Sequence, residues 1–382
     1  MKKARKPVDD TGVAGSTPLS TEGQAPAAGS TILQEFLHHQ LPLIAGILAC
    51  GFIAAYLQYG YIPGGDRPFP LAEVRVPVWH LIWMGVWTGY TMALVGQAAG
   101  IFALPYSTSV LQFSNPHVTP TMLVLTFLNP IGALLGFRRS GQWNLDFAAA
   151  VCAGGAVGGV IGPFFRATVL ANADTFRVLL GIALALFGIL LFHKAIRDYS
   201  RFGRVLGKDF VATLNSTGAK ASTKKFLIET VSRGFLHVVI QFGAEQRRMS
   251  NVKLFAIGAG VGIISSALGV GGGFLLVPIF AAAYRLPLYI MVAATIPYTI
   301  ALSSAGIFSF MAILPLLGVP PIEPEWAWGF FAAAGGVFGS WWASKTQMYI
   351  PEHVLNLMLG GVTGLVGFIY ILSRFTELPF RL

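Results

Sequence analysis

The stretch Leu268–Pro278, LGVGGGFLLVP, decides the architecture of this chain. It lies in an apolar region where a regular helix is expected, but four glycines in five residues, followed by a proline, interrupt any continuous helix. In hydrocarbon, backbone that leaves a helix has to be buried in protein or line a wet cavity. The N–H groups of such a loop, at the start of a half-helix, form a nest that binds anions. The stretch therefore predicts a broken membrane helix with a site for a small anion.

The composition is that of a polytopic membrane protein. Of the 382 residues, 54% are hydrophobic and only 11% are charged, whereas a soluble domain carries about 25% charged residues. The chain therefore lacks the polar side chains that a globular surface needs. Both cysteines, Cys50 and Cys152, lie in apolar segments, so we expect neither a disulfide nor a cysteine-bound metal.

Most of the net charge of +10 lies in one segment. Residues 194–253 contain twelve Lys or Arg and four Asp or Glu, which is a net charge of +8. A basic block is compatible with nucleic-acid binding, but between membrane segments the positive-inside rule explains it more simply as a cytoplasmic loop. We therefore expect no nucleic acid as a partner.

The apolar segments divide the chain into parts. We expect a disordered cytoplasmic tail over 1–40, an extra transmembrane helix over 41–60, a first transmembrane repeat over 79–193, a basic cytoplasmic loop over 194–252 and a second repeat over 253–373. Within the loop, 194–206 predicts a helical extension. The β-like runs over 225–231 and 235–242 predict a small hairpin. The predicted fold is an all-α membrane protein with this small subdomain in its central loop.

An internal duplication relates the two repeats. A shift of 173 residues aligns Gly85, Gly89, Gly96, Gly100 and Pro105 with Gly258, Gly262, Gly269, Gly273 and Pro278. After a gap, a shift of 181 aligns Gly154, Gly155 and Gly158 with Gly335, Gly336 and Gly339, and a shift of 179 aligns Gly181 and Gly188 with Gly360 and Gly367. Many secondary transporters consist of two such halves around a midplane site.

The distribution of Lys and Arg indicates the orientation of the halves. With a cytoplasmic N-terminus and five crossing segments in each half, the central loop falls inside, with Arg138, Arg139, Arg285 and Lys345. The loop with Glu323 and Glu325 falls outside, and the exceptions to the rule are Arg67, Arg75, Arg166 and the C-terminal arginines. This arrangement predicts inverted repeats. If only one of the first two segments of each half is re-entrant, the repeats become parallel, and this alternative stays open.

The glycine stretch, with its weaker copy over 96–105, resembles the signature of the sulfite exporter TauE/SafE family, also called the 4-toluene sulfonate uptake permease family. The signature is similar to G-x-G-G-G-F-x-x-x-P followed by a segment of small residues with Thr and Ser, here 293–299. The first copy departs from it, with Gln97, Ala98 and Ala99 where glycines are usual. The resemblance covers roughly 79–193 and 252–373. It implies permeation of sulfite, organosulfonates or related small anions across a bacterial-type inner membrane, without fixing the anion or the direction.

Intramembrane polar side chains and the loop backbone are the candidate substrate-binding groups, because such groups are costly in lipid and often functional. For a single Ser or Thr, a hydrogen bond to its own helix is the competing interpretation. Asn129 has an alternative role too, because Pro130 frees a helix carbonyl that its amide would satisfy. The candidates are Gln97, Gly100, Gln112, Thr126, Asn129, Gly271, Gly272, Gly273, Thr295, Tyr298, Thr299 and Ser303.

The residues and motifs within the apolar segments limit the classes of function that fit this chain. No Asp or Glu lies in the middle of a predicted segment, so we expect either a site of neutral dipoles, which suits an anion, or coupling through protonation of the substrate itself. The sequence has no P-loop, no dinucleotide fingerprint and no pair of histidines at metal-ligand spacing, so we expect no enzyme, no cofactor and no metal. The sequence favours a secondary transporter of small anions that works by alternating access. An anion channel or facilitator and a receptor that signals through the loop remain alternatives, and a homodimer stays open.

Overall fold

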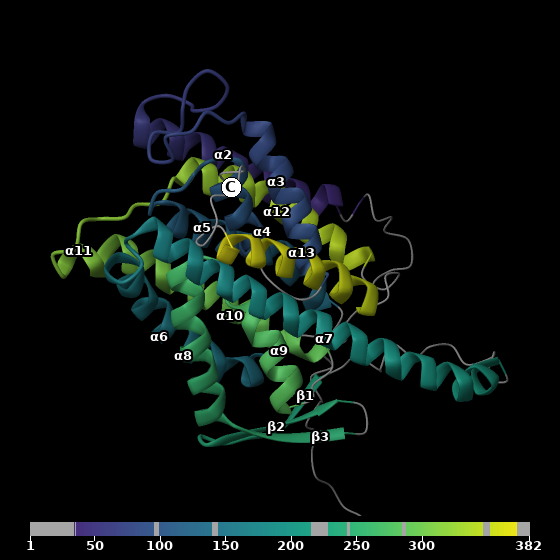
Figure 1. The fold of residues 1–382 in the computed structure, drawn as a ribbon. Coiled ribbons are helices and arrows are strands. Elements are labelled where there is room, and N and C mark those ends of the chain that lie inside the picture. Colours follow the sequence, from purple (N-terminus) through teal and green to yellow (C-terminus); the bar gives the residue numbers. More distant parts are fainter. Residues whose placement is uncertain are drawn as a thin grey trace, which may run out of the picture.

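The computed structural model describes residue 34 and residues 36–94, 99–139, 144–214, 228–242, 245–284, 288–346 and 352–372. Within these ranges the protein is mostly helical, with one small sheet at an end of the helical body (Figure 1). Most of the expected tail and Gln97 lie outside them. The helix expected over 41–60 is α2 (Leu41–Tyr59), and a π-helical turn, η1 (Phe36–Gln40), precedes it.

The helices of the first repeat follow its apolar segments closely. The second of them is short and passes directly into a π-helical turn, because Pro105 ends its regular bonding pattern. The last helix of the repeat is 42 residues long and includes 194–206, so the predicted helical extension is confirmed. The elements are α3 (Val78–Ala93), α4 (Gly100–Pro105), η2 (Tyr106–Val110), α5 (Val118–Arg139), α6 (Leu145–Thr168) and α7 (Ala173–Leu214).

The second repeat has the same order of helices. Its short second helix runs through Pro278, which removes one backbone donor without ending the helix. Its third helix passes into a π-helical turn and one further helical turn. The elements are α8 (Asn251–Leu268), α9 (Gly273–Tyr284), α10 (Leu288–Phe308), η4 (Ser309–Ile313), α11 (Leu314–Leu316), α12 (Trp326–Thr346) and α13 (Glu352–Leu372).

Several of these helices suit a bilayer. Five of those described are long and apolar enough to cross a membrane: Phe36–Tyr59, Leu145–Thr168, Ala173–His193, Asn251–Leu268 and Ala294–Leu316. Shorter apolar helices cover Val118–Leu134 and Gly360–Leu372. Large apolar side chains such as Leu57 and Ile189 lie exposed on the outside of the bundle, where lipid contact accounts for them.

The first helix of each half packs against a helix of the other half. Helix α3 packs against α12, and α8 packs against α6. A Cβ added at Gly85 would overlap the backbone of Ala332, and one added at Gly258 would overlap that of Val151. The duplication aligns the first glycine with the second, and Val151 with Ala332. The same contact therefore occurs twice, and it needs glycine because backbone meets backbone.

Equivalent helices of the two halves run antiparallel where they meet. On α7 and α13, Gly181 lies against Gly367 and Gly188 against Gly360, so the sequence numbers rise on one helix as they fall on the other. Helices α5 and α10 follow the same rule: Leu123 lies against Gly306, and Ala133 packs with Ile296.

The central loop carries a three-stranded antiparallel sheet. Its strands are β1 (Ile228–Arg233), β2 (His237–Phe242) and β3 (Glu245–Ser250), in the order β1-β2-β3. The predicted hairpin corresponds to β1 and β2, although residues 225–227 of its first run lie outside the described ranges. The third strand was not predicted, since its sequence, EQRRMS, has no apolar alternation.

Candidate functional site

The second glycine stretch forms the connection between α8 and α9. Gly269 and Gly271 have φ angles of 78° and 74°, a left-handed backbone that glycine adopts without strain. The N–H groups of Gly269 and Val270 both donate to the carbonyl of Ser265, at 2.9 and 3.1 Å, which closes the end of α8. The chain then starts α9 at Gly273.

The first copy forms the connection between α3 and α4, and it meets the second copy. A Cβ added at Gly100, the first residue of α4, would lie 2.7 Å from the carbonyl oxygen of Val270 and 2.6 Å from Cγ2 of Thr126. Only glycine allows this approach. The first residue of α4, which directly follows the first break, therefore contacts the second break beside α5, although the two lie far apart in the sequence. Gln97 falls on residues that the structure does not describe.

Two buried hydroxyl groups join the halves at this point. Oγ1 of Thr126 lies 2.9 Å from Oγ of Ser303, and both side chains are fully buried. Thr126 also contacts the carbonyl of Leu123 on its own helix. Because the hydroxyl of Thr126 donates to Leu123, the proton of Ser303 lies between the two hydroxyls, and the pair can donate to a third group only when the bond to Leu123 is released.

Asn129 fixes the start of α4. Its amide lies between the carbonyl oxygen of Gly336 at 2.7 Å and the backbone nitrogen of Ala99 at 3.2 Å, so the amide nitrogen donates to the first and the amide oxygen accepts from the second. Its bond goes to α12 rather than to the carbonyl that Pro130 frees. Asn129 thus connects the first break to the partner helix of the other half.

Tyr298 supports the second break. Its ring lies between Gly155 and Gly272, each so close that a Cβ would overlap the ring, and its hydroxyl donates to the carbonyl of Gly258 at 2.9 Å. The hydroxyl is therefore occupied by α8, and the ring forms a wall behind the loop.

The remaining candidates lie apart from the breaks or bond within their own helix. Thr299 donates to the carbonyl of Thr295 at 2.8 Å, the competing interpretation for an intramembrane threonine, and both residues are buried. Gln112 is exposed at the end of η2, with a φ of 62°, and donates to the carbonyl of Ser109. The structure does not bring Gln112 to the other candidates.

Comparison with known proteins identifies the family. A family model described as Sulfite exporter TauE/SafE matches residues 81–370, which include both glycine stretches. The chain belongs to the TauE/SafE family. No curated protein and no solved structure matches it. The resemblance inferred from the glycine stretches is therefore confirmed. The protein is a multi-pass membrane transporter of the sulfite exporter family, and not an enzyme.

One buried group beside the second break of this TauE/SafE protein was not predicted. Ser265, whose carbonyl holds the loop, is fully buried, and its hydroxyl has no hydrogen-bond partner among the described residues. An unpaired buried hydroxyl is costly, which makes Ser265 a further candidate for substrate binding. The sequence signal for Ser265 is its position one helical turn before Gly269, at the end of α8.

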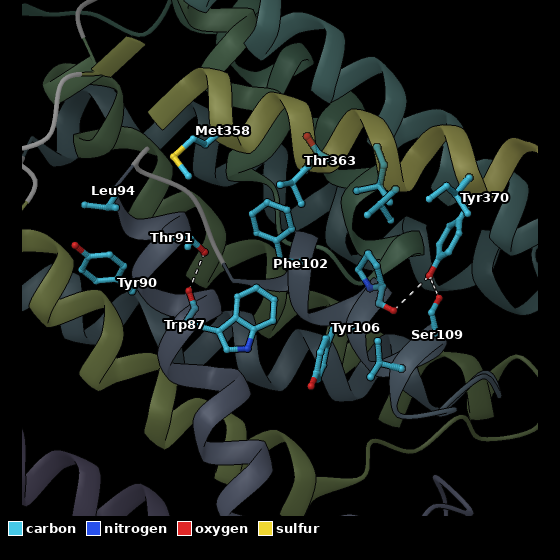
Figure 2. Close-up of a pocket in the computed structure, with 16 residues that line it drawn as sticks. Trp87, Tyr90, Thr91, Leu94, Phe102, Tyr106, Ser109, Met358, Thr363 and Tyr370 are labelled. Atoms are coloured by element: carbon cyan, nitrogen blue, oxygen red, sulfur yellow. Dashed lines mark hydrogen bonds between the residues drawn. The ribbon is translucent and has the colours of Figure 1, made fainter. Parts of the chain in front are cut away.

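An apolar cavity lies beside the first break of the TauE/SafE fold. It has a volume of about 540 Å³ between α3, α4 and α13, and Trp87, Phe102 and Tyr106 line it (Figure 2). The hydroxyl of Tyr370, at one end, contacts Thr108 and Ser109. Without a charged side chain or a free polar wall, the cavity does not suit an anion.

The duplication repeats this cavity in the other half. A second apolar cavity, of about 360 Å³, lies beside α9. Four of its lining residues align with four of the first: Ile263, Ile264, Ala267 and Leu275 with Tyr90, Thr91, Leu94 and Phe102. Each break is therefore flanked by an apolar cavity, whereas the hydroxyls of Thr126 and Ser303 lie where the start of α4 meets the second break.

Proposed function

We propose that this protein is a secondary transporter of sulfite or an organosulfonate, with one substrate site where the two helix breaks meet. The observation that carries the proposal is the contact of Gly100 with Val270 beside the buried pair of Thr126 and Ser303. Loop N–H groups and hydroxyls are neutral donors, and they bind an oxyanion without a repelling carboxylate. Gly271, Gly272 and Gly273 supply such donors from the second half.

We further propose that the halves are inverted repeats that exchange access to this site between the two sides of the membrane. The antiparallel packing of α7 with α13 and of α5 with α10 supports this, since a two-fold axis in the membrane plane turns each helix into an antiparallel copy. Parallel repeats would make equivalent helices parallel. The arrangement also agrees with a cytoplasmic N-terminus and central loop.

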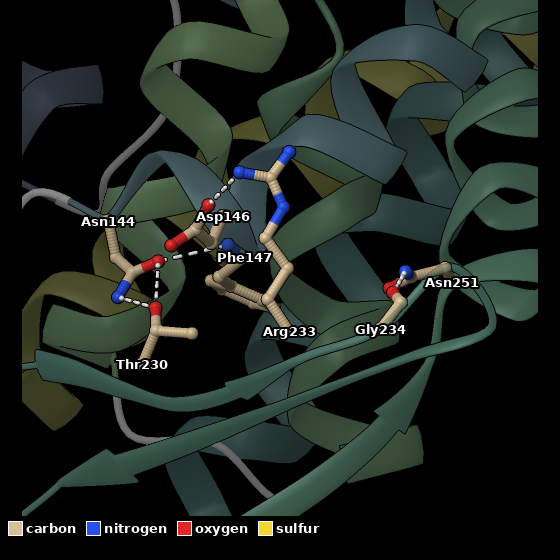
Figure 3. Close-up of polar contacts among 7 residues, drawn as sticks. All are labelled: Asn144, Asp146, Phe147, Thr230, Arg233, Gly234 and Asn251. Atoms are coloured by element: carbon tan, nitrogen blue, oxygen red, sulfur yellow. Dashed lines mark hydrogen bonds and ion pairs between the residues drawn. The ribbon is translucent and has the colours of Figure 1, made fainter.

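In this proposal the sheet of the central loop stays bound to the start of α6. Arg233 forms an ion pair with Asp146 at the start of α6, 2.7 Å between Nη1 and Oδ1, and Asn144 donates to Thr230 at 3.0 Å (Figure 3). Asn144 also caps α6 by accepting from the N–H of Phe147. These contacts tie the sheet to the helix that packs with α8.

The test uses purified protein in liposomes with labelled sulfite, sulfoacetate and taurine. A carrier gives saturable uptake that unlabelled substrate on the opposite side accelerates, because the return of the loaded site is faster than that of the empty one. A channel conducts without this acceleration. Uptake no greater than in empty liposomes for every sulfur anion would overturn the proposal, and the double variant Thr126→Val with Ser303→Ala should lower the affinity, whereas Ser304→Ala should not.

A further inference from the structure

The structure contains a buried arginine without a counter-ion. Arg166 lies in the last turns of α6 and is only 1% exposed. Among the described residues no carboxylate lies within ion-pair distance of Arg166, and Asp146, at the other end of α6, pairs with Arg233. A buried charge is strongly disfavoured unless a partner compensates it, and a charged side chain within a membrane segment commonly marks a substrate path.

The partners of Arg166 are all neutral. Nε donates to Oγ1 of Thr119 at 2.9 Å, Nη1 donates to the carbonyl of Leu170, and the ring centroid of Phe176 lies 4.3 Å from Cζ. Nη2 has no hydrogen-bond partner among the described residues. Capping of α6 explains the bond to Leu170. Capping does not explain why a fully charged guanidinium is buried with N–H donors that have no partner among the described residues.

The surroundings of Arg166 connect it to the second helix break. A Cβ added at Gly269 would lie 2.7 Å from the carbonyl oxygen of Thr119 and 3.1 Å from its Cγ2. Thr119 thus contacts the guanidinium with its hydroxyl and the glycine loop with its backbone. One chain of contacts runs from Arg166 through Thr119 to Gly269, and it involves α6, α5 and the connection between α8 and α9.

We propose that Arg166 is an anion-binding residue of the transport path, which holds the sulfite or sulfonate oxyanion together with the hydroxyl of Thr119 beside the second break. This inference rests on the proposed transport function. A guanidinium presents two parallel N–H donors that match two oxygens of such a group, and it keeps its charge at every physiological pH. The oxyanion supplies the missing counter-ion, and the neutral donors of the central site receive it next.

The test compares Arg166→Gln and Arg166→Lys with a matched control, Arg177→Gln, one residue beyond Phe176. Sulfite binding to each purified protein is measured by calorimetry, uptake in liposomes gives KM and kcat, and thermal unfolding without anion reports the fold. We expect Arg166→Gln to weaken sulfite binding about 10- to 150-fold, as for loss of a charged hydrogen bond. Arg166→Lys should lose less, because it keeps the charge, and Arg177→Gln should bind as the native protein does.

The outcomes separate an anion site from a helix cap. Lysine cannot bond Thr119 and Leu170 at once as the fork does, so a pure cap predicts that Lys and Gln lower the unfolding temperature alike and leave sulfite affinity unchanged. That result would overturn the inference. If Arg166→Gln does not fold, Arg166→Lys decides: native affinity overturns the inference, and weakened affinity supports it. Native protein that binds sulfite through Arg166 but moves none would instead contradict the proposed transport function.

Discussion

Oγ1 of Thr126 on α5 lies 2.9 Å from Oγ of Ser303 on α10, and the bond joins the third helices of the two halves. The duplication pairs Thr126 with Thr299, not with Ser303. Residues that are equivalent by a two-fold axis meet only where they lie on the axis. Where two equivalent helices cross near the two-fold axis, most of the residues in contact are not equivalent to each other. The pair therefore gives the centre of the molecule a polar contact without a symmetric copy.

The first prediction concerns this bond. Thr126→Val should destabilise the protein by about 1–3 kcal/mol, because it leaves the buried hydroxyl of Ser303 without its partner. Ser303→Ala should cost less, because the hydroxyl of Thr126 keeps its bond to Leu123. The double variant should cost less than the sum, with a coupling of about 0.5–1.5 kcal/mol. Unfolding in mixed micelles measures the free energies. The control pairs Thr126→Val with Ser304→Ala, because Ser304 is exposed and donates to its own helix at Ala301. A coupling free energy as large in the control pair as in the test pair would contradict a specific bond between Thr126 and Ser303.

The second prediction concerns the close approach at Gly272. A Cβ there overlaps the ring of Tyr298, so Gly272→Ala should force the loop or the ring to move and destabilise the protein by about 1–3 kcal/mol. Gly260→Ala is the control: the glycine lies exposed on α8 with no atom near its Cβ position. Alanine there should stabilise α8 by about 0.5–1 kcal/mol.

The measurement for both glycine variants is thermal unfolding together with sulfite uptake. Replacement of Tyr298 by leucine in the Gly272→Ala protein should recover part of the lost stability, because the shorter side chain makes room. An alanine at position 272 that leaves stability and uptake unchanged would mean that the loop and the ring separate freely.

Local signals were sufficient to predict the helices and the breaks. The bounds of α9, Gly273–Tyr284, coincide with the apolar run that begins at the end of the glycine stretch, and a basic residue and a proline follow that run in the sequence. The strand β3 was not predictable from pattern, since EQRRMS is polar at every position but one, and its pairing with β2 determines it.

Burial of single charged groups could not be predicted. In the sequence, Arg166 stands out only as an exception to the positive-inside rule, and its contacts with Thr119 of α5 and Phe176 of α7 reveal its burial. Glu325 belongs to a loop before α12, yet it is fully buried, because Tyr59, Leu71 and Ala72 converge on it from a distant part of the chain. Such convergence is a property of the tertiary fold.

The third prediction concerns orientation. Phe235, between β1 and β2, is 96% exposed, and Leu317, after α11, is also exposed. In a background with Cys50 and Cys152 replaced by alanine, single cysteines at Phe235 and at Leu317 should react with an impermeant thiol reagent from opposite sides of the membrane, the first from the cytoplasmic side. Labelling of both from one side would exclude the proposed topology, and an unmodified cysteine-free protein controls for background.

The last prediction concerns the buried carboxylate. Glu325 accepts a hydrogen bond from the hydroxyl of Tyr59 at 2.6 Å and another from the N–H of Leu71 at 3.0 Å, so it holds α2 against the start of α12. Burial raises the pKa of Glu325 above its usual value of 4.5, against the opposing effect of these hydrogen bonds. The folded state therefore keeps a proton that the unfolded state releases. The stability that this proton provides is complete below about pH 4.5 and is lost as the pH rises through the raised pKa.

We therefore expect the unfolding free energy of the native protein to fall with rising pH by about 1.4 kcal/mol per unit across that window, relative to Glu325→Gln, which has no proton to lose. Thermal unfolding of both proteins in detergent from pH 4 to pH 8 measures the difference. Glu323→Gln is the matched control, because Glu323 lies two residues away and is exposed, so its removal should leave the pH profile of the native protein unchanged. A native protein that gains stability over Glu325→Gln as the pH rises would show that the hydrogen bonds outweigh burial and that the carboxylate is held ionised.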